Sequence, residues 1–148
     1  MRADQMAEDY PVVSLDAEAI EAARLMAASR SPGIVVVDAD GTPQSILPAA
    51  QVVAFIVPTY IQDDPSLAGV LTELAADKVV DKLKGRTVRS LLPKETTELA
   101  RVGSDDTIIE VAAVMARLRC PLVAVMEGTR MIGVISASRL LELALAPD

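Results

Sequence analysis

The sequence predicts an α+β fold in which one β-α-β-β-α unit occurs twice, with the two copies packed pseudo-symmetrically into one module. Three observations predict it. Residues 13–38 align without a gap over residues 102–127, at an offset of 89 residues, and ten of the 26 pairs are identical. Each copy has the same succession of apolar runs and turn residues. A chain of 148 residues can bury one sizeable core, whereas either copy alone is marginal.

The identical pairs indicate an internal duplication rather than a shared composition. An alanine-rich chain would match by chance at its alanines, but these matches include aspartate, glutamate, arginine and proline. An offset of 89 residues is also too long for one turn of a solenoid. The identical pairs are Val13/Val102, Asp16/Asp105, Ile20/Ile109, Glu21/Glu110, Ala23/Ala112, Met26/Met115, Ala27/Ala116, Arg30/Arg119, Pro32/Pro121 and Val36/Val125.

The first copy begins with a short apolar strand at residues 12–14. Asp16 is expected to cap the helix that follows, whose apolar face runs through residues 19–27 at helical spacing. The β-branched run at residues 34–37 predicts a strand buried on both faces. A turn rich in aspartate and glycine then leads into a return strand at residues 44–47.

The second copy repeats this order after a short helical turn at residues 88–93. Here Asp105 or Asp106 is the expected helix cap. The predicted elements are a strand at 100–102, a helix face at 108–116, strands at 122–126 and 131–135, and a final helix at 138–145.

The last helix of the first copy is unusually apolar, and the segment after it has no counterpart in the second copy. The helix at residues 49–57 contains a single polar residue, Gln51, so we expect it to lie in an oligomer interface. Residues 59–86 have no counterpart in the chain, and Asp64-Pro65 is typical of a helix start. The predicted organisation is a first repeat at 1–58, a helical insert at 59–86 and a second repeat at 87–148.

Charge and cysteine content restrict the partners and the compartment. The net charge of -7 and pI of about 4.6 argue against nucleic-acid binding. Residues 1–70 carry three basic and ten acidic side chains, whereas residues 71–148 carry eleven of each, so an anion would meet less repulsion in the second half. The single cysteine, Cys120, excludes an intramolecular disulfide. We therefore expect a cytoplasmic protein that does not insert into membranes.

The second hairpin carries a resemblance to a known family. The run PLVAVMEGTRMIGVIS at residues 121–136 looks like the cystathionine-β-synthase (CBS) domain, a pair of which is called a Bateman module. Its most specific part is residues 133–136, which match the family's glycine, two apolar residues and Ser/Thr. TVRSLLP at residues 87–93 resembles the family's lead-in to a repeat. The resemblance covers nearly the whole chain apart from residues 59–86.

The resemblance implies a disc-like pair of repeats that forms a homodimer through its helices and regulates another protein, such as a transporter or an enzyme. It also implies AMP, ADP, ATP or another adenosyl ligand in a cleft between the repeats. The chain departs from the family where an Asp holds the ribose. That position is Arg139 in the second copy and Gln51 in the first, where Pro48 also replaces the Ser/Thr.

At the second copy, two interpretations remain open. Ser136 at a helix start, with Ser138 and Arg139, provides hydroxyl and guanidinium groups suited to a phosphate. Alternatively, Ser136 caps the helix and Arg139 pairs with a nearby carboxylate. The resemblance also places the entries to the strands at the cleft wall. The candidate ligand-binding residues are Ser136, Ser138, Arg139, Val102, Pro121, Leu122, Val13, Ser14, Pro32, Gly33 and Gln51.

Nothing in the sequence indicates an enzyme. The chain has no histidine, so it lacks the commonest general base and metal ligand. Its one cysteine has no histidine to activate it, and no phosphate-binding glycine loop is present. Two functions remain: a module that senses an adenosine-type nucleotide or another anionic metabolite and relays it to a partner, or a dimeric adaptor that has lost its ligand.

Overall fold

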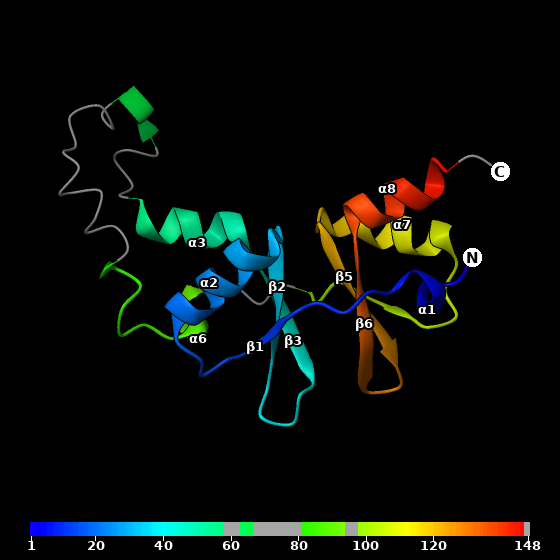
Figure 1. Cartoon of the computed structure of the whole chain (residues 1–148), viewed down its shortest axis with the longest axis horizontal. Helices are drawn as coiled ribbons and strands as arrows, with labels where there is room; N and C mark the ends of the chain where they lie inside the picture. Colours follow the sequence, from blue (N-terminus) through cyan, green and yellow to red (C-terminus); the bar gives the residue numbers. More distant parts are fainter. Residues whose placement is uncertain (58–62, 67–80, 94–97, 147–148) are drawn as a thin grey trace.

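A computed structural model describes residues 1–57, 63–66, 81–93 and 98–146 of the chain (Figure 1). Most of the helical insert predicted at residues 59–86 lies outside these residues. The elements are α1 (Ala3–Met6), β1 (Val12–Ser14), α2 (Ala19–Ser29), β2 (Gly33–Val37), β3 (Pro43–Pro48), α3 (Ala49–Ile56), α6 (Val88–Leu91), β4 (Arg101–Gly103), α7 (Ile108–Leu118), β5 (Leu122–Glu127), β6 (Arg130–Ser136) and α8 (Ala137–Ala144).

The backbone confirms the duplicated β-α-β-β-α unit. Each copy has a three-stranded sheet with its central strand parallel to the first strand and antiparallel to the third. The long helices α2 and α7 begin and end at residues 89 apart. Both end on an arginine in the left-handed conformation, Arg30 with φ 52° and Arg119 with φ 50°. An uncommon conformation at the same place in each copy is strong evidence of a repeated unit.

The two sheets lie next to each other at the centre of the molecule, with helices on their outer sides (Figure 1). Side chains alternate along the central strands: Val36 points into the helix-covered core of the first copy, and Val35 into the layer between the sheets. That layer also contains Leu122 of β5 and Val134 of β6. Since all of residues 33–37 are buried, the prediction of a strand covered on both faces is confirmed.

The helix start of the second copy differs from the expectation. Neither Asp105 nor Asp106 caps α7; Thr107 does, through a hydrogen bond from the Glu110 N–H to its Oγ1 (3.3 Å). The Asp106 carboxylate accepts the Gly103 N–H instead (2.9 Å). The prediction of an aspartate cap was wrong because a turn separates the strand from the helix, and the aspartate closes that turn.

In the first copy the expected cap is also wrong. Glu18 occupies the N-cap position of α2, and its side chain makes no capping hydrogen bond. The Asp16 carboxylate lies 3.2 Å from the Arg89 guanidinium of α6, so it helps to hold that helix rather than α2.

The short lead-in helices are exchanged between the copies. α1 packs beside the second copy and α6 beside the first, as Figure 1 shows. The Ala3 N–H donates to the Asp106 carbonyl (2.7 Å) and the Val88 N–H to the Ala17 carbonyl (2.9 Å). These two acceptors are 89 residues apart, so each lead-in occupies the same place on the opposite copy. The exchange ties the two copies together.

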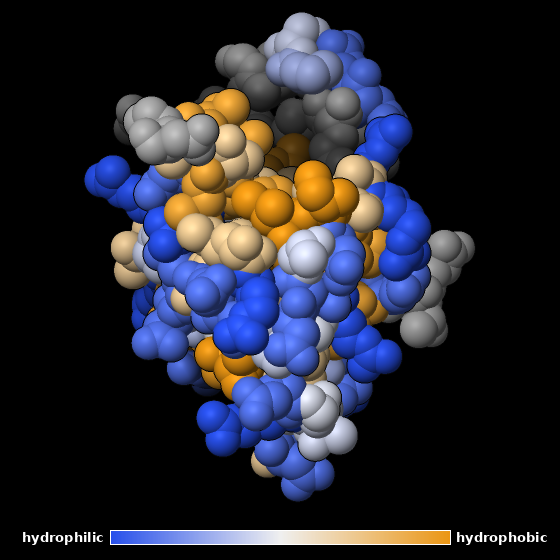
Figure 2. Space-filling view, turned by 90° about the vertical axis from the view of Figure 1, so that its right-hand side faces the viewer, coloured by the Kyte–Doolittle hydropathy of each residue, from blue (hydrophilic) through white to orange (hydrophobic). Residues whose placement is uncertain are grey.

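The second helix of each copy leaves apolar side chains in solvent. In α3 only Val52 is buried, and Val53 is 55% exposed. In α8 Leu141 is 58% exposed, and Leu145 follows at its end. Figure 2, which faces the second copy, shows hydrophobic atoms gathered across its upper half, the side on which α8 lies in Figure 1. Within the described residues, no helix combines the length and apolar character needed to span a membrane.

Candidate functional site

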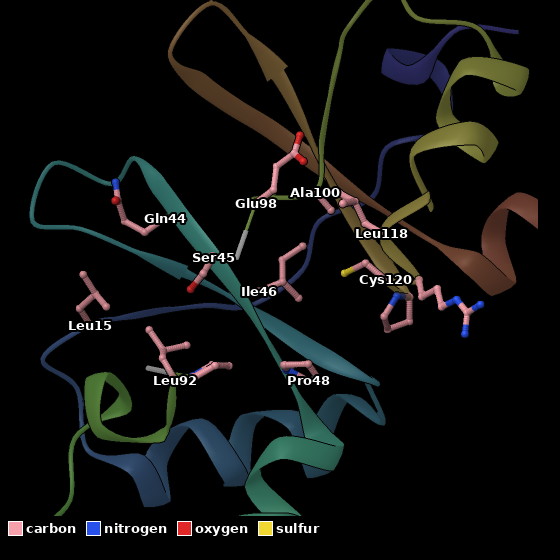
Figure 3. A pocket seen from close by; sticks show the side chains of 13 residues that line it. Leu15, Gln44, Ser45, Ile46, Pro48, Leu92, Glu98, Ala100, Leu118 and Cys120 are labelled. Carbon is pink, nitrogen blue, oxygen red and sulfur yellow. The ribbon is translucent and has the colours of Figure 1, made fainter. Parts of the chain in front are cut away.

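A cavity of about 590 Å³ lies where the two copies meet. The first copy contributes Leu15 and the outer edge of β3, and the second contributes the chain before β4 and the end of α7. Figure 3 shows these two sets of side chains on opposite sides of the cleft. The volume is typical of a small-molecule site. The lining residues are Leu15, Gln44, Ser45, Ile46, Pro48, Leu92, Pro93, Glu98, Ala100, Leu118, Arg119, Cys120 and Pro121.

Most of the cleft wall is apolar. Leu15, Ile46 and Leu92 come from one side, and Ala100 and Leu118 from the other. Two facing apolar walls suit a flat ring, because a ring inserted between them removes apolar surface from water on both faces. The walls would therefore accept the base of a nucleotide or a similar ring.

Ser45 supplies a polar group that the protein leaves unused. Its Oγ is buried, yet it has no hydrogen-bond partner among the described residues. A buried hydroxyl without a partner costs about 1–3 kcal/mol, so such a group in a cleft is a candidate for ligand contact. It sits on β3, beside the apolar Ile46.

The two charged side chains that line the cleft, Glu98 and Arg119, differ in whether they have an ion-pair partner. The Glu98 carboxylate accepts two hydrogen bonds from the Arg117 guanidinium, at 2.9 Å and 3.1 Å, and these bonds hold the pKa of Glu98 below its usual value. The negative charge of Glu98 is therefore paired with Arg117, which does not line the cavity. Arg119 is exposed and forms no ion pair within the described residues. Among the described residues, Arg119 thus gives the cleft a positive charge without an ion pair, which suits an anionic group.

Cys120 lies in the cleft wall with its sulfur half-buried. Burial raises the pKa of the thiol, although a hydrogen bond with the Leu122 backbone partly opposes this shift. The thiol is therefore protonated near neutral pH, which favours an inert wall residue over a nucleophile.

The position of Cys120 gives a direct measure of cleft occupancy. Iodoacetamide should alkylate it more slowly than free cysteine near neutral pH, and faster as the pH rises through the raised pKa. A ligand in the cleft at ten times its Kd should slow the reaction by about tenfold, because only the free protein reacts. Mass spectrometry of the alkylated protein measures both rates. Unchanged alkylation with a ligand that demonstrably binds would place the ligand elsewhere.

The structure separates the candidate residues of the second helix start from this cleft. Ser136 is buried and caps α8 by accepting the Arg139 N–H (3.1 Å). The Ser136 and Ser138 hydroxyls lie 3.2 Å apart. The Arg139 guanidinium lies 3.1 Å from the Glu142 carboxylate and 3.8 Å from that of Glu8. Of the two interpretations left open by the sequence, the structure therefore has the second: Ser136 caps the helix, and Arg139 pairs with nearby carboxylates.

The remaining candidates are dispersed, and Pro121 alone among all the candidates lines the cavity. Pro32 is exposed, and its carbonyl accepts the Ala49 N–H. Gln51 donates to the Leu91 carbonyl (3.3 Å), so its amide holds α6. The others are Val13 and Val102, buried in the helix-covered cores, Leu122 and Gly33, buried near one another, and Ser14, whose Oγ accepts the Asp16 N–H.

Several cleft residues were missed by sequence reasoning. Ser45 was not a candidate, yet it lines the cavity and its buried hydroxyl has no hydrogen-bond partner among the described residues. Arg119 matched Arg30 in the duplication, and this match was read as a sign of repetition alone. The exchange of the lead-in helices, which brings Leu92 to the cleft, leaves no periodic signal in four-residue helices.

Comparisons with known proteins agree with this architecture. The family model for the CBS domain matches residues 88–146. A CBS domain-containing protein of unknown function from Kribbella flavida is 60% identical, with 99% of each chain covered and a TM-score of 0.85. The CBS domain of a CBS domain-containing membrane protein from Sphaerobacter thermophilus is 15% identical, covering 99% of this chain and 90% of that one, with a TM-score of 0.73.

A third solved structure contains a ligand. It is the complex of CBSX2 with AMP, and CBSX2 has also been solved as the Arabidopsis thaliana protein. The chain in the AMP complex is 16% identical, with 97% of this chain and 96% of that one covered and a TM-score of 0.68. A search of curated proteins found no significant match. CBS-domain proteins are regulatory, and the identity and coverage of the Kribbella flavida protein extend over both copies. The chain belongs to the CBS-domain family, and its two copies form a CBS pair.

Proposed function

We propose that this chain is a regulatory module that binds an adenine nucleotide, or an anionic metabolite of similar shape, in the cleft along β3, and relays its presence to a partner protein. The observation that carries the proposal is the cavity of about 590 Å³, with its apolar walls, its unpartnered Ser45 hydroxyl and its free Arg119 guanidinium. The AMP complex of CBSX2 supports the ligand class, since the two chains share a fold.

The apolar walls and the Arg119 charge together suggest how a nucleotide would be oriented in the cleft. The apolar walls would hold the base, and Arg119 at the end of α7 would contact a phosphate. Gln51 already bonds to the Leu91 carbonyl, so the ribose would rely on Ser45. Because the ligand would touch both copies, binding would favour one relative placement of the two sheets. That placement is the signal a partner could detect.

A thermal-shift panel of AMP, ADP, ATP, NADH and S-adenosylmethionine tests the proposal. A ligand present at one hundred times its Kd should stabilise the protein by about 2.7 kcal/mol. Arg119→Ala should reduce the shift given by phosphate-bearing ligands, and Arg139→Ala is the matched control because its guanidinium already lies near two carboxylates. A larger effect of Arg139→Ala would assign the ligand to the start of α8, and no shift with any ligand would favour the adaptor.

The adaptor remains a second candidate because of the exposed apolar surface on α3 and α8. Val53, Leu141 and Leu145 are 55%, 58% and 79% exposed. We propose that these helices join two copies of the chain into a homodimer, as expected from the apolar helix at residues 49–57. Exposed apolar surface of this kind marks an interaction site more often than chance.

Static light scattering checks the dimer. The native chain should have twice the monomer mass at micromolar concentration, and Val53→Glu should shift it toward monomer by at least about tenfold in Kd, because a carboxylate would be buried at the interface. Glu110→Gln, on the exposed surface of α7, should leave the mass unchanged. A native chain that scatters as a monomer would remove the dimer from the account.

A further inference from the structure

The pseudo-symmetry relates the β3 cleft to a corresponding place at β6, called here the second cleft, but the two are not equivalent. Ser45 and Gly133 correspond, because they pair with Val36 and Val125 on the central strands, which are 89 residues apart. Leu92 and Ala7 also correspond, because they end α6 and α1 with similar dihedral angles, φ -68° and ψ 147° against φ -62° and ψ 140°. In the open cleft, Ser45 and Leu92 both line the cavity.

In the second cleft the corresponding residues touch one another. The chain after α1 runs along the edge of β6, where the Glu8 N–H donates to the Val134 carbonyl (2.8 Å) and the Val134 N–H donates to the Glu8 carbonyl (2.9 Å). Gly133 permits this approach: a Cβ at that position would lie 2.8 Å from the Ala7 Cβ and 3.2 Å from the Glu8 carbonyl oxygen. Residues 7–9, here called the strap, therefore lie directly against β6, where the corresponding Ser45 and Leu92 line an open cavity in the first copy.

The strap also places a carboxylate, that of Glu8, near the Arg139 guanidinium. The Glu8 carboxylate lies 3.8 Å from Arg139, and Glu142 lies 3.1 Å from the same guanidinium. Arg139 is therefore shared between two carboxylates, whereas its counterpart in the first copy, Gln51, is uncharged and donates to the Leu91 carbonyl. An anion entering beside Ser136 would have to replace Glu8.

The first copy cannot form the same strap. Pro93 follows Leu92 as Glu8 follows Ala7, and proline has no N–H to donate. Ser45 also places a side chain where Gly133 has none. Pro93 and Ser45 therefore both disfavour a contact of this kind at β3. Glu8 and Gly133 both permit it at β6, where the strap makes two backbone hydrogen bonds.

We propose that the strap is an autoinhibitory contact which closes the β6 cleft, so that one chain offers a single open site for a phosphate-bearing ligand. Release of the strap exposes a second site of the same class, with Ser136, Ser138 and Arg139 at its mouth. The identity of the ligand rests on the proposed function; the strap itself does not. A partner or ligand that displaced residues 7–9 would therefore change the number of sites.

Amide hydrogen exchange by NMR tests the strap without any ligand. In the native chain the amides of Glu8 and Val134 should be protected, because each donates across the bridge. Glu8→Pro copies Pro93 and removes one donor, and Ala7 already has the extended backbone that a following proline requires. The Val134 amide should then exchange at least about tenfold faster, while Glu8→Ala, which keeps the N–H, should leave it within about threefold of native.

Gly133→Ala provides an independent release, because the added Cβ would overlap Ala7. Its effect should be confined to residues 8 and 134, with the amides of β2 and β5 exchanging as in the native chain. This variant also decides the matter if Glu8→Pro fails to fold. A Val134 amide that is unprotected in the native chain, or that responds equally to Glu8→Ala and Glu8→Pro, overturns the strap.

Titration with ATP by calorimetry then counts the sites. The native chain should bind one equivalent, and Glu8→Pro two. A native stoichiometry of two, or a stoichiometry of one in a variant whose Val134 amide has been freed, contradicts closure of a second site. An absence of binding to both proteins would count against ATP as the ligand of the proposed function, and the exchange rates would still decide whether the strap exists.

Discussion

Replacing Leu122 by alanine should lower the free energy of unfolding by about 2–5 kcal/mol. Leu122 is fully buried between the two sheets, where it packs with Val35 and Val37 of the first copy and Val134 of the second. Truncation would leave a cavity at the junction of the copies, because strands fixed by pairing on both sides can collapse little around it. Urea unfolding followed by circular dichroism measures the change.

The same experiment tests whether the copies unfold together. A single cooperative transition is expected in both proteins, because the layer between the sheets and the exchanged lead-in helices join the copies. Ile109→Ala is the matched control: its side chain is 74% exposed, so its loss should change stability by no more than about 0.5 kcal/mol. Two separate transitions, or a Leu122→Ala effect no larger than that of the control, would mean that the copies are not held together by this layer.

Filling the β3 cleft should strongly weaken ligand binding. Ser45→Trp would place an indole against Ile46 and Leu92, in the space assigned to the base. We expect an increase in Kd of about 100-fold for whichever nucleotide stabilises the native chain, equivalent to about 2.7 kcal/mol. Calorimetric titration gives the Kd, and the melting temperature of the unliganded variant shows whether it remains folded.

Ser138→Trp is the control for this substitution. Ser138 is exposed at the start of α8 and does not line the cavity, so the same indole there should leave the Kd within about threefold of native. Equal losses in both variants would point to a general effect of added bulk. A loss confined to Ser138→Trp would assign the ligand to the β6 side.

The sequence was sufficient for the repeated unit because each part of it leaves a periodic signal. The β-branched run at residues 34–37 and the apolar spacing of α2 both reflect burial, and burial is what hydrophobic patterns report. The boundaries of α2 and α7 agree with the duplication to the residue. Capping was predicted less well. Asp105 and Thr107 are both good cap residues, and the choice between them depends on the length of a turn that no periodicity reveals.

The site was harder to predict, because clefts are made by residues from different parts of the fold. Comparison with the family pattern directed attention to Ser136 and Arg139, whose types suit a phosphate. Their availability depends on Glu8, which no local pattern connects with them. Ser45 and Arg119 become candidates only when the two copies are placed against each other. Whether a cleft is open is thus a property of the packing, as the contrast between Gly133 and Ser45 illustrates.

The central claim is that a ligand binds where the two copies meet along β3. A two-dimensional NMR titration with the strongest stabiliser from the nucleotide panel tests it most directly. The account predicts that the largest shift changes fall on both copies at once, at Ser45 and Ile46 of the first and at Leu118 to Pro121 of the second. Changes restricted to one copy, or centred on residues 136–139, would contradict it.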